Sequence, residues 1–476
     1  MKLLLLFTLL FSISFAQSYE EYLRSQEEAF SSYKEERDKK FSDFLNKEWK
    51  AYKQSQGLKS YEEDKPKTIP TAKKRKIIPV KEKTIVVIKP IKKSLSKPLK
   101  KIIIPPESEK LKTLYMTYFG VDLQVHYDNS ILMPSMHSIS KTEIKRAWDS
   151  LAKSNYEVTI KELNEVSRQL QLNDWARYLL VKQLSSKLYR HDNDAIAFSW
   201  FVLLKMGYDA HIAYQQHRLI LLLPVKGELY STVHYSLGSK QYYAIDYYAK
   251  GKLGSIMTYE HAYKGSNKSI DFSLSKLPLF SPDIISKRFS FKPSRKLYSL
   301  TLNYDKHLLN FYQTYPQVNY KNYFFASHST LLDESVKKEF KTLLVGKSQS
   351  EALDILLNFV QNAFHYKVDE EQFNREKVMF ASETLYYPYS DCEDRAILFA
   401  YLVQTLLGME VIGLKYPNHM ATAVKMDEKI KGEYIEVNKS AYVVADPTYI
   451  NASLGVSMPE YRGKKSYEIV STGGEK

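Results

Sequence analysis

One cysteine, one histidine and one aspartate in the C-terminal part of the chain have the types and order that nucleophilic catalysis needs. Cys392, His419 and Asp446 follow one another at equal intervals of 27 positions, and Cys392 is the only cysteine among 476 residues. Thiol attack on an acyl carbon needs a base that takes the thiol proton, and that base needs a carboxylate that fixes its tautomer. The three residues therefore predict a cysteine-dependent acyl-transfer or hydrolytic site.

The sequence around Cys392 predicts that this residue lies in the first turn of a helix. Apolar residues recur at three- and four-residue spacing over 396–407, and Gly408 is a typical helix stop. Ser390 or Asp391 can cap the start. The backbone N–H groups of a helix start favour a thiolate, although the acidic residues that follow Cys392 oppose it.

His419 and Asp446 belong to two short segments with strand-like patterns. The segment 418–424 contains His419, and the apolar run 442–445 ends at Asp446. A helix start that faces two neighbouring strands can bring the three side chains together. We therefore expect an α+β fold in which the helix that carries Cys392 packs on an antiparallel sheet.

Three motifs resemble those of the bacterial transglutaminase-like, papain-like cysteine enzymes. They are Asp-Cys-Glu-Asp-Arg-Ala at 391–396, Tyr-Pro-Asn-His-Met-Ala at 416–421 and Ala-Asp-Pro-Thr-Tyr at 445–449. They occur in the order of the family, and the resemblance covers roughly residues 345–465. That superfamily includes peptidases, amidases, transglutaminases and members without activity, so the resemblance does not choose the reaction.

The resemblance implies a role for each matched residue. Cys392 would be the nucleophile, His419 the general base and acid, and Asp446 the orienting carboxylate. The amphipathic segment 350–365 would be a helix on the catalytic core, from which Gln361 would donate to an oxyanion beside the Cys392 backbone N–H. The residues themselves predict no cofactor and no metal ligands. The run 391–394 is also similar to that of periplasmic cysteine proteinases that cut surface adhesins, which implies that calcium could bind near the site.

The N-terminus has the pattern of a secretory signal peptide. Lys2 precedes an apolar run over 3–15, and small residues around Ala16 offer a cleavage site before Gln17. We expect residues 1–16 to be removed and the mature chain to be exported to the periplasm or the extracellular space, without a transmembrane segment. A single cysteine cannot form a disulfide within one chain, so its presence in an oxidising compartment favours a functional use.

Residues 17–60 predict a long helix with an aromatic stripe. Tyr19, Phe30, Phe41 and Tyr52 repeat every eleven residues, which keeps them on one helix face. The stripe either docks on the globular part of the same chain or serves for self-association or for binding a partner.

Residues 61–106 predict an extended linker. They contain 14 Lys and Arg, four Asp and Glu, and many prolines, so they supply about ten of the fifteen net positive charges. Most such charges are simply solvated, but the segment could also bind an anionic envelope surface. Nucleic acid is not expected as a partner, because an exported protein has little access to it. The runs 85–88 and 102–104 could each add weakly to a sheet edge.

Residues 107–294 predict an α+β domain that could be a degenerate copy of the catalytic unit. The segments 194–201 and 395–402 align without gaps, which sets His191 at the position of Cys392 and places His217 near the position of His419. The strand that ends at Asp246 mirrors the one that ends at Asp446. Duplication and chance similarity both remain open.

The remaining chain predicts a connector and the catalytic domain. Residues 295–345 begin with an alternating strand at 296–304 and continue as a loop-rich stretch, which we interpret as a β connector. Residues 346–476 would form the transglutaminase-like domain.

Two functions of different class fit this organisation. The first is a cysteine peptidase or amidase of the cell envelope that works through an acyl-enzyme, with a cross-linking transglutaminase as its variant. The second is a non-catalytic envelope scaffold that keeps the fold as a binding platform.

Overall fold

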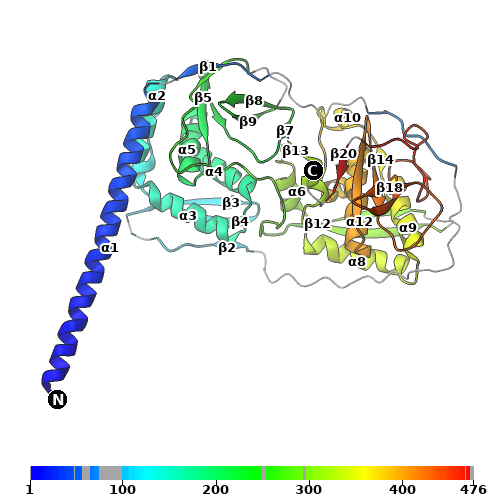
Figure 1. The fold of residues 1–476 in the computed structure, drawn as a ribbon, viewed down its shortest axis with the longest axis horizontal. Helices are drawn as coiled ribbons and strands as arrows, with labels where there is room; N and C mark the ends of the chain where they lie inside the picture. Colours follow the sequence, from blue (N-terminus) through cyan, green and yellow to red (C-terminus); the bar gives the residue numbers. More distant parts are fainter. Residues whose placement is uncertain are drawn as a thin grey trace.

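The chain is an α+β protein whose helices and strands form two adjoining bodies, with the long helix α1 projecting from the first (Figure 1). The α+β class is thus confirmed. The computed structural model describes residues 2–47, 49–55, 65–73, 99–106, 108, 110–248, 253–292, 296–466 and 468–471.

Helix α1, Lys2–Leu45, docks only through its C-terminal turns. Phe41 and Leu45 are buried, and the Phe41 ring contacts the ring of Trp148 with centroids 4.7 Å apart. In contrast, Tyr19 and Phe30 are 63% and 69% exposed. The aromatic stripe therefore splits: Phe41 packs on the chain's own domain, as one alternative predicted, and Tyr19 and Phe30 are exposed. The helix expected to reach residue 60 ends at Leu45, and Tyr52 lies in the strand Lys50–Tyr52, so it does not share the helix face.

The side chains of the expected signal peptide lie outside the described part of the chain. Within the part that is described, no helix combines the length and the hydropathy that a membrane crossing requires.

The first unit consists of a helical layer, an antiparallel sheet and a separate three-stranded sheet that includes one parallel pair. Its helices are η1 Asn129–Ile131, α2 Lys141–Ala152, α3 Tyr156–Gln169, α4 Asp174–Leu188 and α5 Asp192–Lys205. Its strands are β1 Lys50–Tyr52, β2 Lys101–Ile102, β3 Lys112–Tyr118, β4 Val121–Tyr127, β5 His211–Gln215, β6 Arg218–Leu222, β7 Leu229–Tyr230, β8 Thr232–Leu237, β9 Lys240–Tyr248 and β10 Ile256–Thr258.

The central strands of this unit follow one another across a continuous surface. The order β1-β10-β5-β6 is hydrogen-bonded, and β8 pairs with β9. An antiparallel bridge between Leu223 and Tyr243 joins β6 to β9, with backbone N–H to O distances of 2.9 and 3.0 Å in the two directions. The full order is therefore β8-β9-β6-β5-β10-β1.

A hairpin, three helices and the short strand β13 connect the two units. They are β11 Ile284–Phe291, β12 Tyr298–Asp305, α6 Lys306–Tyr312, β13 Gln317–Val318, α7 Tyr320–Phe324 and α8 Thr330–Leu344. The expected strand is confirmed as β12, but the expected loops after it are wrong, because this stretch is largely helical. The ring of Phe340 on α8 lies 5.2 Å from that of Phe359 on α9, so α8 packs with the second unit.

The second unit surrounds a buried helix with an antiparallel sheet and smaller helices. Its helices are α9 Gln349–Asn362, α10 Asp369–Phe373, α11 Ala381–Tyr386 and α12 Cys392–Leu407. Its strands are β14 His365–Tyr366, β15 Tyr389–Ser390, β16 Val411–Tyr416, β17 His419–Val424, β18 Tyr434–Val437, β19 Ser440–Ala445 and β20 Glu468–Val470, and the five-stranded sheet has the order β18-β19-β17-β16-β20.

Helix α12 forms the centre of the second unit. Most of its residues are buried, from Cys392 through Leu406. It ends at Gly408, whose φ of 67° favours glycine, so the predicted helix and its stop are confirmed. Because α12 is covered on most sides, its first turn is held rigidly where the sheet and α10 meet it.

The two units share one order of elements. In each, a helix is followed by two hairpins and a further strand, and β8-β9-β6-β5-β10 matches β18-β19-β17-β16-β20. The last residue pair before the hairpin turn also matches in the two units. It is Gln215 with Arg218 between β5 and β6, and Tyr416 with His419 between β16 and β17. This agreement in sheet order supports the duplication that the sequence suggested.

Two pieces of the predicted linker are described. Residues 65–73 lie against the second unit, where Thr71 forms a parallel bridge with Ile450. Residues 99–106 include β2, which adds to the sheet edge beside β4, as the run 102–104 predicted. The run 85–88 lies outside the described residues.

Candidate active site

Cys392 is the first residue of α12 and is 2% exposed. Asp391 precedes it with an extended backbone, and the Asp394 carboxylate accepts a hydrogen bond from the Asp391 backbone N–H at 3.3 Å. Asp394 also accepts from the Met379 N–H at 2.8 Å. These contacts satisfy donors near the helix start and fix the first turn, so the thiol has a defined position.

His419 and Asp446 form a buried pair. The distance from His419 Nε2 to Asp446 Oδ2 is 2.9 Å, and both side chains are 2% exposed. The other carboxylate oxygen of Asp446 accepts hydrogen bonds from the backbone N–H groups of Thr448 and Tyr449 at 3.0 and 3.1 Å. Asp446 is thereby held in place, and Nδ1 is the His419 nitrogen left for proton transfer.

Cys392 and His419 line the same cavity. It also includes Tyr320 from α7 and has a volume of about 10 Å³, which is room for about one water molecule. Residues expected from sequence to form a triad are thus brought to one place: the thiol from a helix start, the imidazole from the first residue of β17, and the carboxylate from the end of β19.

Tyr461 covers the imidazole on one side. Its ring stacks on the His419 ring with centroids 4.9 Å apart and an interplanar angle of 16°, and its hydroxyl donates to the Pro417 carbonyl at 3.0 Å. Stacking of this kind limits rotation of the imidazole, so Tyr461 is a positioning residue that sequence analysis missed.

Gln361 is buried but binds backbone atoms. Its amide nitrogen donates to the carbonyl oxygens of Asp446 and Ala452, both at 3.0 Å, and it is not among the residues that line the cavity. Because both amide hydrogens are used within the described fold, the expected oxyanion donor does not match this arrangement. Gln361 instead fixes the segment that follows Asp446.

The environment of Cys392 favours the thiol over the thiolate. Burial raises the pKa of Cys392 well above its usual value, and the negative charges of Glu393 and Asp391 raise it further. The thiol donates to Glu393 Oε2 at 3.0 Å. The expected activation by the helix start is therefore outweighed in this closed arrangement, since desolvation disfavours the anion.

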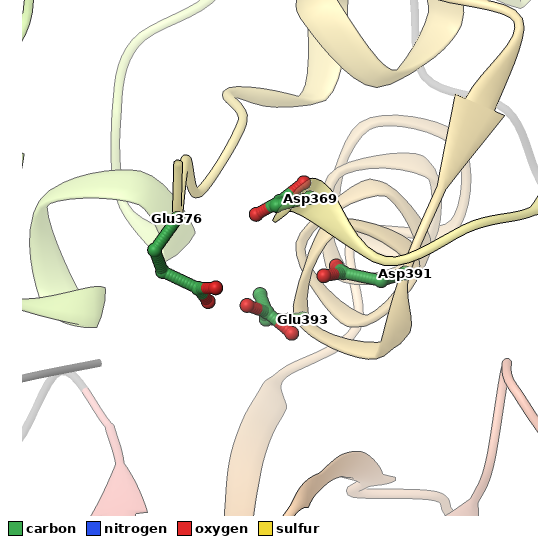
Figure 2. A group of neighbouring side chains, drawn as sticks. All are labelled: Asp369, Glu376, Asp391 and Glu393. Atoms are coloured by element: carbon green, nitrogen blue, oxygen red, sulfur yellow. The ribbon is translucent and has the colours of Figure 1, made fainter. Parts of the chain in front are cut away.

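Four carboxylates gather beside the thiol. Asp369 comes from α10, Glu376 follows α10, and Asp391 and Glu393 flank Cys392; Figure 2 shows the four side chains pointing toward one another. One oxygen from each lies within 4.8 Å of all the others. Such a group is stable only when a cation or protons offset its charge.

The cation in this structure is the ammonium group of Lys65. Its Nζ lies 2.8 Å from Asp391 Oδ2 and 3.9 Å from Asp369 Oδ2, and it also contacts the carboxylates of Glu376 and Glu393. The Lys65 side chain is only 7% exposed. Burial alone would lower the pKa of Lys65, but its four acidic neighbours raise that pKa well above its usual value.

The carboxyl groups of the cluster differ in charge. Burial raises the pKa of Glu376 to about 8 and that of Asp391 to about 6. Burial would also raise the pKa of Glu393, but the Lys65 ammonium and the hydrogen bonds that Glu393 accepts lower it to about 2. Of the Glu376, Asp391 and Glu393 carboxyl groups, Glu393 is therefore the one whose charged form is favoured, and it pairs with Lys65 directly beside the thiol.

The same carboxylates fit a hard divalent cation. Calcium binds six to eight oxygen ligands, mainly carboxylates and carbonyls. Asp391 Oδ1 is buried and has no hydrogen-bond partner among the described residues. This orphaned oxygen and the four-carboxylate set fit the calcium that the sequence resemblance implied, provided that Lys65 leaves.

The matched positions of the first unit differ in chemistry and burial. His191 stands at the place of Cys392, before α5, and is exposed. The register sets Arg218, and not His217, at the place of His419. Asp246 matches Asp446, but its carboxylate binds Tyr178 and Lys182 at 2.9 and 2.6 Å. The first unit therefore keeps only the carboxylate of the triad.

Several residues of the site gave no signal in the sequence. None of the three motifs contains Asp369, Glu376 or Lys65. The fold brings these residues close to Cys392. Glu393 lay within a motif, where its charge was noted as opposing the thiolate but not as part of a cluster. Comparisons of the chain with protein families, with curated proteins and with solved structures found no match.

Proposed function

We propose that this chain is an exported, transglutaminase-like cysteine peptidase or amidase of the cell envelope. One observation carries the proposal: His419, which pairs with Asp446 at 2.9 Å, lines the same cavity as Cys392 at the start of α12. Acyl transfer through a thioester requires a thiol, an imidazole that can take its proton and a carboxylate that orients the imidazole.

The roles follow from the contacts. His419 takes the thiol proton through Nδ1, and Cys392 Sγ forms a bond to the acyl carbon while Asp446 stabilises the imidazolium through Nε2. His419 then gives the proton to the leaving amine, and a thioester remains. Water, deprotonated by His419, attacks this thioester, which releases the acid and restores the thiol. The Cys392 backbone N–H at the helix start is suited to the developing oxyanion.

Hydrolysis is the reaction that we propose, because water is the default acceptor for a thioester in an aqueous compartment. An amine acceptor would give a cross-linking transglutaminase instead. Both use the same first half-reaction, so they differ only in the product that the experiment below detects.

A calcium ion would have a supporting role. When bound by Asp369, Glu376, Asp391 and Glu393, it would offset the negative charge beside the thiol. Even with the Lys65 ammonium in the cluster, burial and the charges of Glu393 and Asp391 hold the pKa of Cys392 well above its usual value.

Export and envelope location rest on the predicted signal peptide at 1–16. The basic residues of 61–106 would contact an anionic envelope surface, and the exposed aromatic residues of α1, from Tyr19 to Tyr33, would bind a partner or a second copy.

A second candidate is a non-catalytic scaffold. It is favoured by the first unit, which has lost two of three triad residues, and by the protonated thiol. The mature chain and its Cys392→Ala variant, incubated with envelope extract, separate the candidates when new protein termini and new isopeptide links are read by mass spectrometry. We expect new termini with the wild type only. New isopeptide links alone would indicate transfer, and identical products from both proteins would favour the scaffold.

A further inference from the structure

Residues 65–73 cross the candidate active site although they belong to the polar linker. Lysine side chains of such segments are normally solvated. Lys65 instead buries its ammonium group among four carboxylates, including those on both sides of Cys392. Removing a charged group from water is costly unless specific partners of opposite charge surround it. The carboxylates around Lys65 are such partners.

Lys65 also lines the cavity that Cys392 and His419 share. The remaining volume of about 10 Å³ accommodates about one water molecule, whereas ligand sites typically measure about 300–1,000 Å³. A peptide cannot reach the thiol in this arrangement. Among the lining residues, Lys65 is the one that comes from the linker, whereas the others belong to α7 and to the helices, strands and turns of the second unit.

A second anchor holds the other end of this segment. The Ala72 backbone N–H donates to the Ile450 carbonyl at 2.8 Å, and Thr71 pairs with Ile450 as an isolated parallel bridge. The Ala72 side chain packs beside Tyr449 and its neighbours. Ile450 lies four positions after Asp446, so the segment is tied to the cysteine side of the site at one end and to the aspartate side at the other.

We propose that residues 65–73 form an inhibitory strap that closes the active site and must leave before a substrate reaches Cys392. The inference rests on the proposed function and deepens it by naming how the site is regulated. In the closed state the strap contributes a cation to the carboxylate cluster, and the thiol donates to Glu393. Release of the strap opens the cavity and frees those carboxylates for another cation.

Alkylation of Cys392 by iodoacetamide tests the strap, because the chain has no other cysteine. The reactions contain a chelator, so that Lys65 is the only cation offered to the cluster. Ala72→Pro removes the N–H that binds Ile450 and keeps Lys65, while Ala72→Ser keeps the N–H and is its matched control. We expect labelling to be about tenfold faster or more in Ala72→Pro than in Ala72→Ser and the wild type, since access to the thiol changes most.

Lys65→Met is a second variant, with Lys67→Met at an exposed position of the strap as control. The variant removes the strap's ion pairs with the carboxylates beside Cys392, so we expect it to be labelled faster than Lys67→Met. Near-UV circular dichroism and thermal unfolding show whether each variant is folded. Unchanged labelling in folded Ala72→Pro and folded Lys65→Met would overturn the strap.

The same variants separate the strap from the function. If the strap variants are labelled faster but produce no new protein termini in envelope extract, the strap proposal is supported and the peptidase proposal is rejected. New termini at the same rate in the wild type and in both strap variants would support the peptidase and remove the strap.

Discussion

The two units have the same order of paired strands, yet of the matched positions only those of the second unit hold a thiol and an imidazole. In the second unit Cys392, His419 and Asp446 are all buried, whereas His191 and Arg218 at the matched places of the first unit are exposed. Burial concentrates the effect of each charge, because a low-dielectric surrounding strengthens every electrostatic contact. The comparison teaches that the topology supplies positions, and that enclosure and residue type decide whether those positions can do chemistry.

The largest expected contrast is between the two matched aspartates. Asp446→Asn should lower kcat by about 10³- to 10⁴-fold, because an amide holds the wrong tautomer of the imidazole. Asp246→Asn should leave kcat within about twofold, since its carboxylate binds Tyr178 and Lys182 away from the thiol. Turnover of an envelope protein, measured by new termini, checks both. Equal losses of kcat in the two variants would show that the two aspartates do not differ in function.

One buried group in each unit should make stability depend on pH in opposite directions. Burial lowers the pKa of His211 in the first unit to about 4, from 6.5, so the unfolded chain binds more protons and stability falls as pH drops below 6.5. Burial raises the pKa of Asp354 in the second unit to about 6, from 3.8, so its stabilising contribution is full below 3.8 and is lost as pH rises to 6. Each corresponds to roughly 3 kcal/mol.

Hydrogen exchange of amides in each unit, followed between pH 4 and 7, measures these slopes. His211→Phe should flatten the slope of the first unit only, and Asp354→Asn that of the second unit only. A single slope that both variants change equally would mean that the two units unfold as one body.

Two buried or half-buried amide side chains offer a smaller contrast. Gln361 holds the backbone after Asp446, while Asn193 in the first unit holds the β5–β6 turn through the His217 carbonyl and the Leu219 N–H, both at 2.9 Å. Gln361→Ala should lower kcat about thirtyfold with little change in KM, because it loosens the carboxylate that orients His419. Asn193→Ala should change neither constant. A rise in KM alone would assign Gln361 to substrate binding.

Cation binding should depend on the second unit and on the strap. Among the described residues, the four-carboxylate group beside Cys392 is the one cluster suited to a metal ion. Calcium should bind about tenfold more tightly to Lys65→Met than to Lys67→Met, because the ammonium no longer competes. Calorimetry of both variants, with Glu376→Gln as a further control, measures the difference. Equal affinities would show that calcium and Lys65 use different groups.

The parts of the site that sequence could predict are those fixed by local pattern. The helix start at Cys392, the stop at Gly408 and the strands that carry His419 and Asp446 follow from apolar spacing and turn residues, and all are confirmed as elements. The chemical roles expected of Cys392, His419 and Asp446 were predictable from their residue types, and the match of their order to a known family from the three motifs.

The parts that sequence missed depend on contacts between distant segments. Lys65 lies 327 positions before Cys392 (392 minus 65), and a charged linker gives no sign that one of its lysines will be buried. Tyr461 was one of many tyrosines until the fold stacked it on His419. Of the helices after β12, α6 and α7 are too short to give a clear periodic pattern. Helix α8 does carry apolar residues at helical spacing, at Leu332, Val336 and Phe340, so its pattern was present in the sequence and was missed.

The most direct test of the central claim is the pH dependence of Cys392 alkylation in chains with the strap released. In an Ala72→Pro background, we predict that His419→Ala lowers the labelling rate at neutral pH by about tenfold or more. Arg218→Ala, at the matched place of the first unit, should leave the labelling rate unchanged. Equal labelling in the His419→Ala and Arg218→Ala chains across the pH range would contradict the account.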